Sequence, residues 1–166
     1  MTYLLRTILA SFIVFILQVT LVHNVTVAGA SPDLIMVMLV VLVIDRNPIA
    51  GIIVGFLLGF LQDLGNASFL GMSALAKCIV GFGIAKYGRD YFPDNILFRG
   101  LLVFVSCLIN DIITLHVSTS FAPVEVIVAF FRYSLLSAVY TALLAVMVMQ
   151  IIDILPRRMV RSGGRY

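Results

Sequence analysis

Charged side chains that could do chemistry lie inside the apolar stretches of this chain: Asp63, Lys77, Asp111 and Arg132. Charges are costly within a bilayer, so such residues usually pair with one another or serve a function. At a helical rise of 1.5 Å per residue, Lys77 lies about 12 Å and Asp111 about 10 Å from the outer ends of their stretches. Arg132 has a depth similar to that of Lys77, and Asp63 lies near the outer end of its own stretch.

We therefore predict a buried polar cluster in which Lys77 and Arg132 face Asp63 and Asp111, with Asn110 beside Asp111. The charges of these cations and anions sum to zero, as burial in a medium of low polarity requires. The sequence does not specify which cation meets which anion. Such a network can fix the register of the helices or bind a ligand or ion, and the structural role is the more common one.

The residue types needed for catalysis or metal binding do not occur in a recognisable pattern. His23 and His116 are not accompanied by a Gly-x-Ser-x-Gly nucleophile motif, and Cys78 and Cys107 lack the spacing of metal ligands. The glycines lie inside an apolar helix without a preceding strand, unlike those of nucleotide-binding loops. We expect no catalytic residue, no metal and no cofactor, and therefore no enzyme. The basic C-terminal residues are too few to indicate nucleic-acid binding.

The composition determines the kind of element that must position these residues. The chain has 166 residues, of which 62% are hydrophobic and 11% charged, with a mean hydropathy of +1.15. A soluble domain carries about 25% charged residues and could not bury so much apolar surface at this size. Disordered chains are poor in apolar residues. We predict an all-α integral membrane protein, in which each crossing takes about 20 residues.

Apolar stretches of suitable length predict a single transmembrane domain over 1–166 with six spans. Their approximate bounds are 8–28, 33–44, 49–64, 69–87, 96–117 and 124–155, and a basic tail follows at 156–166. Ser31-Pro32-Asp33 predicts the start of the second span, because Asp33 suits a helix N-terminus.

Two of the spans have unusual lengths. The second is only about 16 Å long as a helix. We expect it to cross in a protein-packed or locally thinned setting rather than to form a re-entrant hairpin. The last is about 48 Å long, so we expect its first turns, Val124 to Phe131, to lie along the outer interface.

The Lys and Arg residues are distributed unequally over the connecting segments. If the chain starts in the cytoplasm and crosses six times, the outer segments 25–31, 65–68 and 118–124 contain none. The cytoplasmic segments then contain all basic residues except Lys77 and Arg132: Arg6, Arg46, Lys86, Arg89, Arg99, Arg157, Arg158, Arg161 and Arg165. Since cytoplasmic segments of membrane proteins are enriched in Lys and Arg, we predict six spans with both termini in the cytoplasm.

Small residues are spaced for close packing of helices. Gly51, Gly55 and Gly59 recur every four residues on one face of the third span, and Asp63 continues that face one turn further. The fourth span has its own stripe, made of Ala74, Cys78, Gly81 and Ala85. Such stripes let helix backbones approach closely. We predict packing within the molecule rather than a dimer contact, and assign this role to Gly51, Gly55, Gly59, Gly71 and Gly81.

The order of motifs resembles that of a known family. Pro32-Asp33-Leu34 opens a short span, and Gly55-Phe56-Leu57-Leu58-Gly59-Phe60-Leu61-Gln62-Asp63 ends the next one. Leu70-Gly71-Met72-Ser73-Ala74-Leu75 and then Gly81-Phe82 follow. With the chain length and the number of spans, this sequence resembles the MreD family, the small membrane subunit of the bacterial rod-shape machinery. The motifs extend from Pro32 to Gly83, and Phe69 stands where many relatives are expected to have proline.

The resemblance implies a multi-pass protein of the bacterial inner membrane without catalytic activity. It implies binding to MreC and work in the elongasome near RodA, a class B penicillin-binding protein and the MreB filament, in support of peptidoglycan synthesis and rod cell shape. It also implies a fold similar to that of the substrate-binding subunits of energy-coupling-factor transporters. Membrane lipid is the other expected partner.

A second function belongs to a different class: a small-molecule-binding or transport subunit. In that case Asp63, Lys77, Asp111 and Arg132 would line a polar pocket in the outer half of the membrane. Transporters often show internal repeats and broken helices, and no convincing repeat is visible here. An interior filled by side chains favours the scaffold, whereas a large cavity that reaches the outer surface favours transport.

Overall fold

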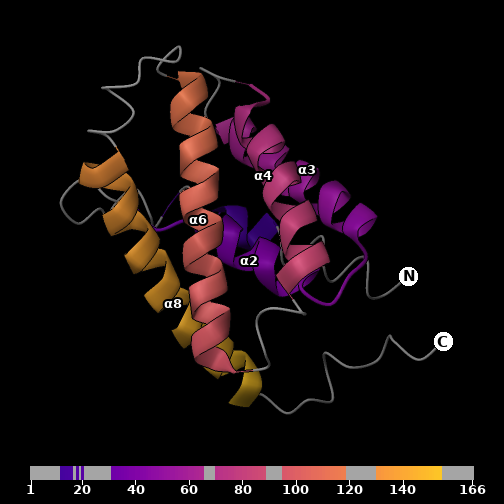
Figure 1. Ribbon diagram of the computed structural model, residues 1–166, viewed down its shortest axis with the longest axis vertical. Coiled ribbons are helices and arrows are strands. Elements are labelled where there is room, and N and C mark those ends of the chain that lie inside the picture. Colours follow the sequence, from indigo (N-terminus) through magenta and orange to yellow (C-terminus); the bar gives the residue numbers. More distant parts are fainter. Residues whose placement is uncertain are drawn as a thin grey trace.

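A computed structural model describes residues 12–16, 18, 20, 31–65, 70–88, 95–118 and 130–154 of the chain (Figure 1). All regular structure in these ranges is helical, which confirms the predicted all-α class. The helices, in chain order, are α2 (Leu34–Val43), α3 (Pro48–Gly65), α4 (Met72–Gly83), η3 (Ile84–Gly88), α6 (Ile96–Ser118), η4 (Phe130–Ser134) and α8 (Leu135–Ile154). Residues 12–16, 18 and 20 are also helical. The π-helical segments η3 and η4 continue α4 and precede α8 without a break.

The helix bounds follow the apolar stretches closely. α2 lies within the expected 33–44, α3 extends the expected 49–64 by one residue at each end, and α6 compares with 96–117. Most of the expected first span (8–28), the turns at 124–129 and the tail at 156–166 lie outside the described residues. Hydrophobic runs therefore predict where these helices begin and end.

α2 lies at the centre of the molecule. Its sequence is apolar around the whole circumference, which is typical of a helix buried on all sides. Met36, Leu39, Val40 and Val43 are 0% exposed, and α2 contacts α3, α4, α6 and α8. In Figure 1 it lies behind α6, with α8 on one side and the α3–α4 pair on the other. The short second stretch is thus packed among protein.

α3 and α4 form the most extensive helix pair, and glycines make their close approach possible. A β-carbon added at Gly51 would collide with the carbonyl oxygen of Gly81, and one added at Gly55 would collide with that of Lys77. One added at Gly59 would collide with the carbonyl oxygen of Ser73. The order of these contacts shows that the helices run antiparallel. The structure therefore places the glycine stripe inside the molecule, with backbone against backbone.

Gly71 does not share this role, and its assignment to helix packing is wrong. A β-carbon at Gly71 would meet nothing within 4 Å. Its φ of 93° lies in the left-handed region, which glycine adopts at little cost and other residues rarely adopt. Gly71 directly precedes α4. It is required for the turn that starts the helix.

α6 and α8 form the second large helix pair. A β-carbon at Gly100 would come within 2.6 Å of Cγ2 of Val146. Ala138 and Ala145 on α8 and Val103 on α6 are 0% exposed. Small residues again allow the close approach of the two helices.

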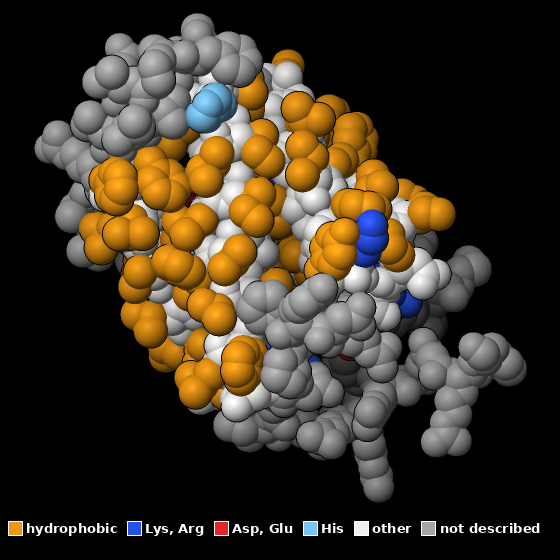
Figure 2. All heavy atoms as spheres, in the orientation of Figure 1, with side chains coloured by type: hydrophobic (Ala, Val, Ile, Leu, Met, Phe, Trp, Pro, Cys, Tyr) orange, Lys and Arg blue, Asp and Glu red, His pale blue; other side chains and the backbone are white. Residues whose placement is uncertain are grey.

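The outer surface of the described helices is strongly apolar. Ile49, Ile53, Leu57 and Leu64 of α3 are more than half exposed, on the sides of the helix away from the glycine stripe. Figure 2 shows hydrophobic side chains spread over this face of the molecule. An apolar surface of this extent indicates a membrane or a partner.

Among the described residues, two helices are long and apolar enough to cross a membrane: Pro48–Gly65 and Ile96–Val117. Leu34–Val43 and Leu135–Gln150 are shorter apolar helices. The length of α2 explains why it falls short, since 10 residues extend only about 15 Å.

Candidate functional site

The buried carboxylate of Asp63 holds the α3–α4 turn together. Asp63 is 3% exposed and lies one helical turn beyond Gly59. Its Oδ2 accepts hydrogen bonds from the backbone N–H groups of Gly71 (2.9 Å) and Ala74 (3.0 Å), and its Oδ1 accepts one from that of Ser73 (3.0 Å). The first N–H groups of a helix have no partner within it, and the helix dipole favours a negative charge there. Asp63 therefore caps α4 from the end of α3.

Lys77 and Asp33 form a buried ion pair. The side chain of Lys77 is 0% exposed, and its Nζ lies 3.1 Å from Oδ2 of Asp33, which is 19% exposed. Oδ1 of the same carboxylate accepts a hydrogen bond from the backbone N–H of Met36 at 2.8 Å, which makes Asp33 the N-cap of α2. The predicted start of the second span at Asp33 is thus confirmed. One carboxylate satisfies both the start of α2 and a cation on α4.

The first helical segment also holds the start of α2. Oε1 of Gln18 accepts a hydrogen bond from the backbone N–H of Leu34 at 2.8 Å. Nε2 of Gln18 donates to the carbonyl oxygen of Pro32 at 3.0 Å. A single amide therefore satisfies a donor and an acceptor of the turn before α2.

α8 holds this turn from another side. The backbone N–H of Asp33 donates to Oγ1 of Thr141 at 3.1 Å, and Thr141 is 0% exposed. Oγ of Ser137, one turn earlier on α8, donates to the carbonyl oxygen of Ser31 at 2.6 Å. We call Gln18, Asp33, Lys77, Ser137 and Thr141 the α2 polar node. It joins α2, α4, α8 and the first helical segment.

Asn110 and Asp111 form a second polar pair, on α6. Nδ2 of Asn110 donates to Oδ1 of Asp111 at 3.3 Å, and Ser134 of η4 lies beside the Asp111 carboxyl group. Oδ1 of Asn110 is buried without a hydrogen-bond partner. The side chain of Arg132 lies outside the described residues. Its pairing with Asp111 stays a prediction.

The partner of Lys77 differs from the arrangement that the sequence predicted. We expected Lys77 to face Asp63 or Asp111, and the structure pairs it with Asp33. The reason is that the oxygens of Asp63 are occupied by the N–H groups at the start of α4. The sequence pointed to Asp33 only as a helix start. Gln18 and Thr141 were not predicted, because a polar residue within an apolar stretch does not reveal which helix it meets.

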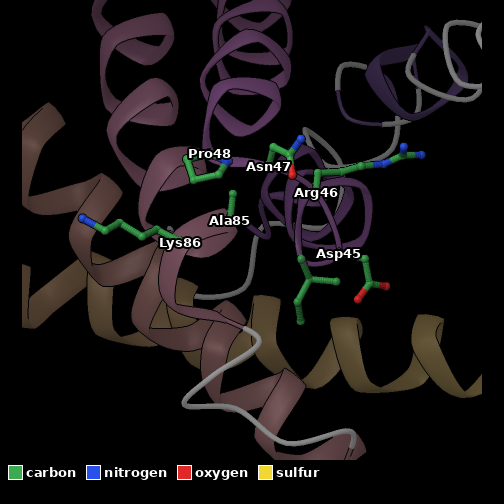
Figure 3. A pocket seen from close by; sticks show the side chains of 7 residues that line it. Asp45, Arg46, Asn47, Pro48, Ala85 and Lys86 are labelled. Atoms are coloured by element: carbon green, nitrogen blue, oxygen red, sulfur yellow. The ribbon is translucent and has the colours of Figure 1, made fainter. Parts of the chain in front are cut away.

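A pocket of about 280 Å³ opens at the opposite end of α2. The turn between α2 and α3 lines one side, and the end of α4 with η3 lines the other. The lining residues are Ile44, Asp45, Arg46, Asn47, Pro48, Ala85 and Lys86. In Figure 3 the Arg46 and Lys86 side chains extend from opposite sides of the pocket. We call this cavity the inner pocket.

The described residues do not assemble a catalytic or metal-binding constellation. In the ranges that the structure covers, no three His, Cys, Asp or Glu side chains lie close enough together to hold a metal ion. Cys78 and Cys107 are free thiols, and Sγ of Cys78 lies 3.6 Å from the carbonyl oxygen of Ile52, across the α3–α4 pair. The chemistry of these polar groups is mutual satisfaction within the fold.

Comparison with known proteins gives one match. The model of the family described as rod shape-determining protein MreD matches residues 1–158. No curated protein and no solved structure was found to be similar to the chain. Proteins of the matching family reside in a membrane and act in rod-shape determination. Because the match covers nearly the whole length, the chain belongs to the MreD family of rod shape-determining proteins.

Proposed function

We propose that this protein is a non-catalytic membrane scaffold of the bacterial elongasome, which binds MreC and supports peptidoglycan synthesis. The observation that carries the proposal is the family match over residues 1–158. A scaffold has to hold a fixed shape against which partner helices can pack. Its polar groups then serve to fix the fold rather than to bind a substrate.

The polar contacts of the described residues support this role. Asp63 is engaged by backbone N–H groups of α4, and Lys77 is engaged by Asp33. Both carboxylates are thus occupied by groups of the same chain. The inner pocket lies at the end of α2 that is remote from the ion pair. This arrangement favours the scaffold over a transport subunit with a polar pocket around Lys77 and Asp63.

We further propose that the chain crosses the bacterial inner membrane six times, with both termini in the cytoplasm. The distribution of Lys and Arg over the connecting segments supports this topology. The fold would then resemble the substrate-binding subunits of energy-coupling-factor transporters. RodA, a class B penicillin-binding protein and MreB would act in the same assembly.

The structure limits which surface can receive the membrane helix of MreC. Gly51, Gly55, Gly59 and Gly81 lie between α3 and α4 and are not available to a partner. Docking would therefore use the apolar outer faces, where side chains such as Leu57 and Leu143 are more than half exposed. In a bilayer such faces associate by packing and not by the hydrophobic effect, because lipid tails are equally apolar.

The test is affinity purification of the protein from its host in a mild detergent, followed by mass spectrometry. The scaffold role predicts recovery of MreC, and no recovery with an unrelated multi-pass protein of similar abundance as the control. Recovery of a pair of transport ATPases without MreC would contradict the proposal and would support the transport function.

A further inference from the structure

The inner pocket has the charge of an anion-binding site. Arg46 and Lys86 contribute two positive charges to its lining, against one negative charge from Asp45. All three side chains are exposed. Its location between the ends of apolar helices would place it at the level of lipid headgroups. Basic pockets between membrane helices on the cytoplasmic side are known to hold anionic headgroups.

The size and the walls of the pocket fit a phosphate ester. A volume of about 280 Å³ exceeds what a single water or metal ion needs. Pro48 begins α3, a helix of 18 residues, so the positive end of its dipole adds to the potential at the pocket. Ile44, Pro48 and Ala85 supply an apolar wall. A phosphate with an apolar tail matches this combination better than a free ion does.

The surroundings of the pocket suit the acyl chains of a lipid. Ile49 follows Pro48 and is 72% exposed. Phe82 and Tyr87 are 37% and 47% exposed, and their ring centroids lie 5.4 Å and 5.1 Å from Nζ of Lys86. Aromatic side chains next to a basic residue are common at the membrane interface. An apolar surface therefore continues from the pocket along the outside of α3 and α4.

We propose that the inner pocket binds the phosphate group of an anionic phospholipid, with Arg46 and Lys86 supplying the positive charge. In Figure 3 these side chains leave the pocket wall in opposite directions. Rotation about the bonds of these long, exposed side chains brings their charges over the mouth of the pocket. Asp45 opposes binding, because its carboxylate repels the phosphate.

The test is a lipid titration of the purified protein in detergent, followed by native mass spectrometry. Phosphatidylglycerol is compared with phosphatidylcholine of the same acyl chains. We expect Arg46→Gln and Lys86→Gln each to weaken phosphatidylglycerol binding about fivefold. Neither variant should change phosphatidylcholine binding. Asp45→Asn should strengthen phosphatidylglycerol binding, and Lys86→Arg should retain it.

Controls separate this result from charge loss in general and from a free anion. Arg99→Gln removes one positive charge outside the pocket and should leave phosphatidylglycerol binding unchanged. Equal binding by wild type, Arg46→Gln and Lys86→Gln would overturn the proposal. Displacement of the lipid by an equal concentration of inorganic phosphate would show that the ligand is a free anion, and would also overturn it. The assay contains no MreC, so its outcome is independent of the proposed scaffold role.

Discussion

Asp63 and Asp33 are both carboxylates at helix starts, yet they balance different groups. Asp63 receives backbone N–H groups of α4. Asp33 receives one backbone N–H and the ammonium group of Lys77. The first arrangement closes a local turn, whereas the second joins parts of the chain that are 44 residues apart. These differences lead to different expectations for mutation.

Replacing Asp63 should destabilise the α3–α4 turn. In Asp63→Ala, buried N–H groups of α4 lose their acceptors, and we expect the free energy of unfolding to fall by about 3 kcal/mol. Asp63→Asn retains one acceptor oxygen and should lose less. Thermal unfolding of the purified protein in detergent measures both. The control is Leu64→Ala, since Leu64 is 58% exposed. An unfolding temperature of Asp63→Ala equal to that of the control would contradict the capping role.

The ion pair of Lys77 and Asp33 predicts strong coupling between two substitutions. Lys77→Met leaves the Asp33 carboxylate without its cation, which costs about 3–5 kcal/mol for a buried pair. Asp33→Asn keeps a good N-cap residue but leaves Lys77 buried without its anion. We expect the double variant Asp33→Asn/Lys77→Met to be more stable than Lys77→Met alone. The free energies of unfolding of the four proteins form the double-mutant cycle, and additive losses would exclude the coupling.

The residues of the site were predictable only in part. A charge within an apolar stretch identifies Asp63, Lys77 and Asp111 as internal, because such a charge has to be compensated. The partner of Lys77 was not predictable, because helix packing determines which carboxylate comes within its reach. Gln18 and Thr141 could have been suspected as polar residues in apolar stretches, but the same pattern also occurs at interfacial positions.

The α3–α4 pair shows how an element depends on the absence of side chains. Gly51, Gly55 and Gly59 recur every four residues, and each contacts the backbone of α4. The contact continues through Asp63, which is the next residue in the same series. Spacing, packing and capping are therefore consequences of one face of α3.

Substitution of a glycine in this contact should separate the helices. The β-carbon of Gly55→Ala would collide with the carbonyl oxygen of Lys77, and overpacking of this kind costs about 1–3 kcal/mol. The matched control is Gly83→Ala in α4, where a β-carbon has nothing within 4 Å. Alanine favours helix over glycine by up to about 1 kcal/mol, so the control should be as stable as the wild type or more stable. Equal unfolding temperatures of the two variants would contradict the packing role of Gly55.

The helices themselves were more predictable than the residues. Apolar runs and the start signal at Asp33 predict α2, α3 and α6 to within about two residues. The π-helical segments η3 and η4 were not predicted, because the sequence periodicity of one widened turn does not differ measurably from that of an α-helix. The role of Gly71 was misjudged for a related reason. A glycine near a helix start can serve packing or a left-handed turn, and only the backbone conformation separates the two.

The molecule as a whole combines a fixed interior with an apolar exterior. α2 is surrounded by α3, α4, α6 and α8, and the α2 polar node ties its start to three other helical segments. The outer faces carry exposed apolar side chains. A rigid core and an apolar exterior are what a membrane scaffold needs. The composition predicted this general architecture, whereas the central position of α2 required the structure.

The most direct measurement of the scaffold role is the binding of MreC's membrane helix to the purified protein. A fluorescent peptide of that helix is titrated in detergent micelles, with energy transfer to a label on the protein as the signal. The control is a peptide with the same residues in scrambled order, which has the same apolar composition. The scaffold role predicts saturable binding of the native peptide and only weak, non-saturable transfer from the scrambled one. Equal signals from both peptides would contradict specific docking of MreC.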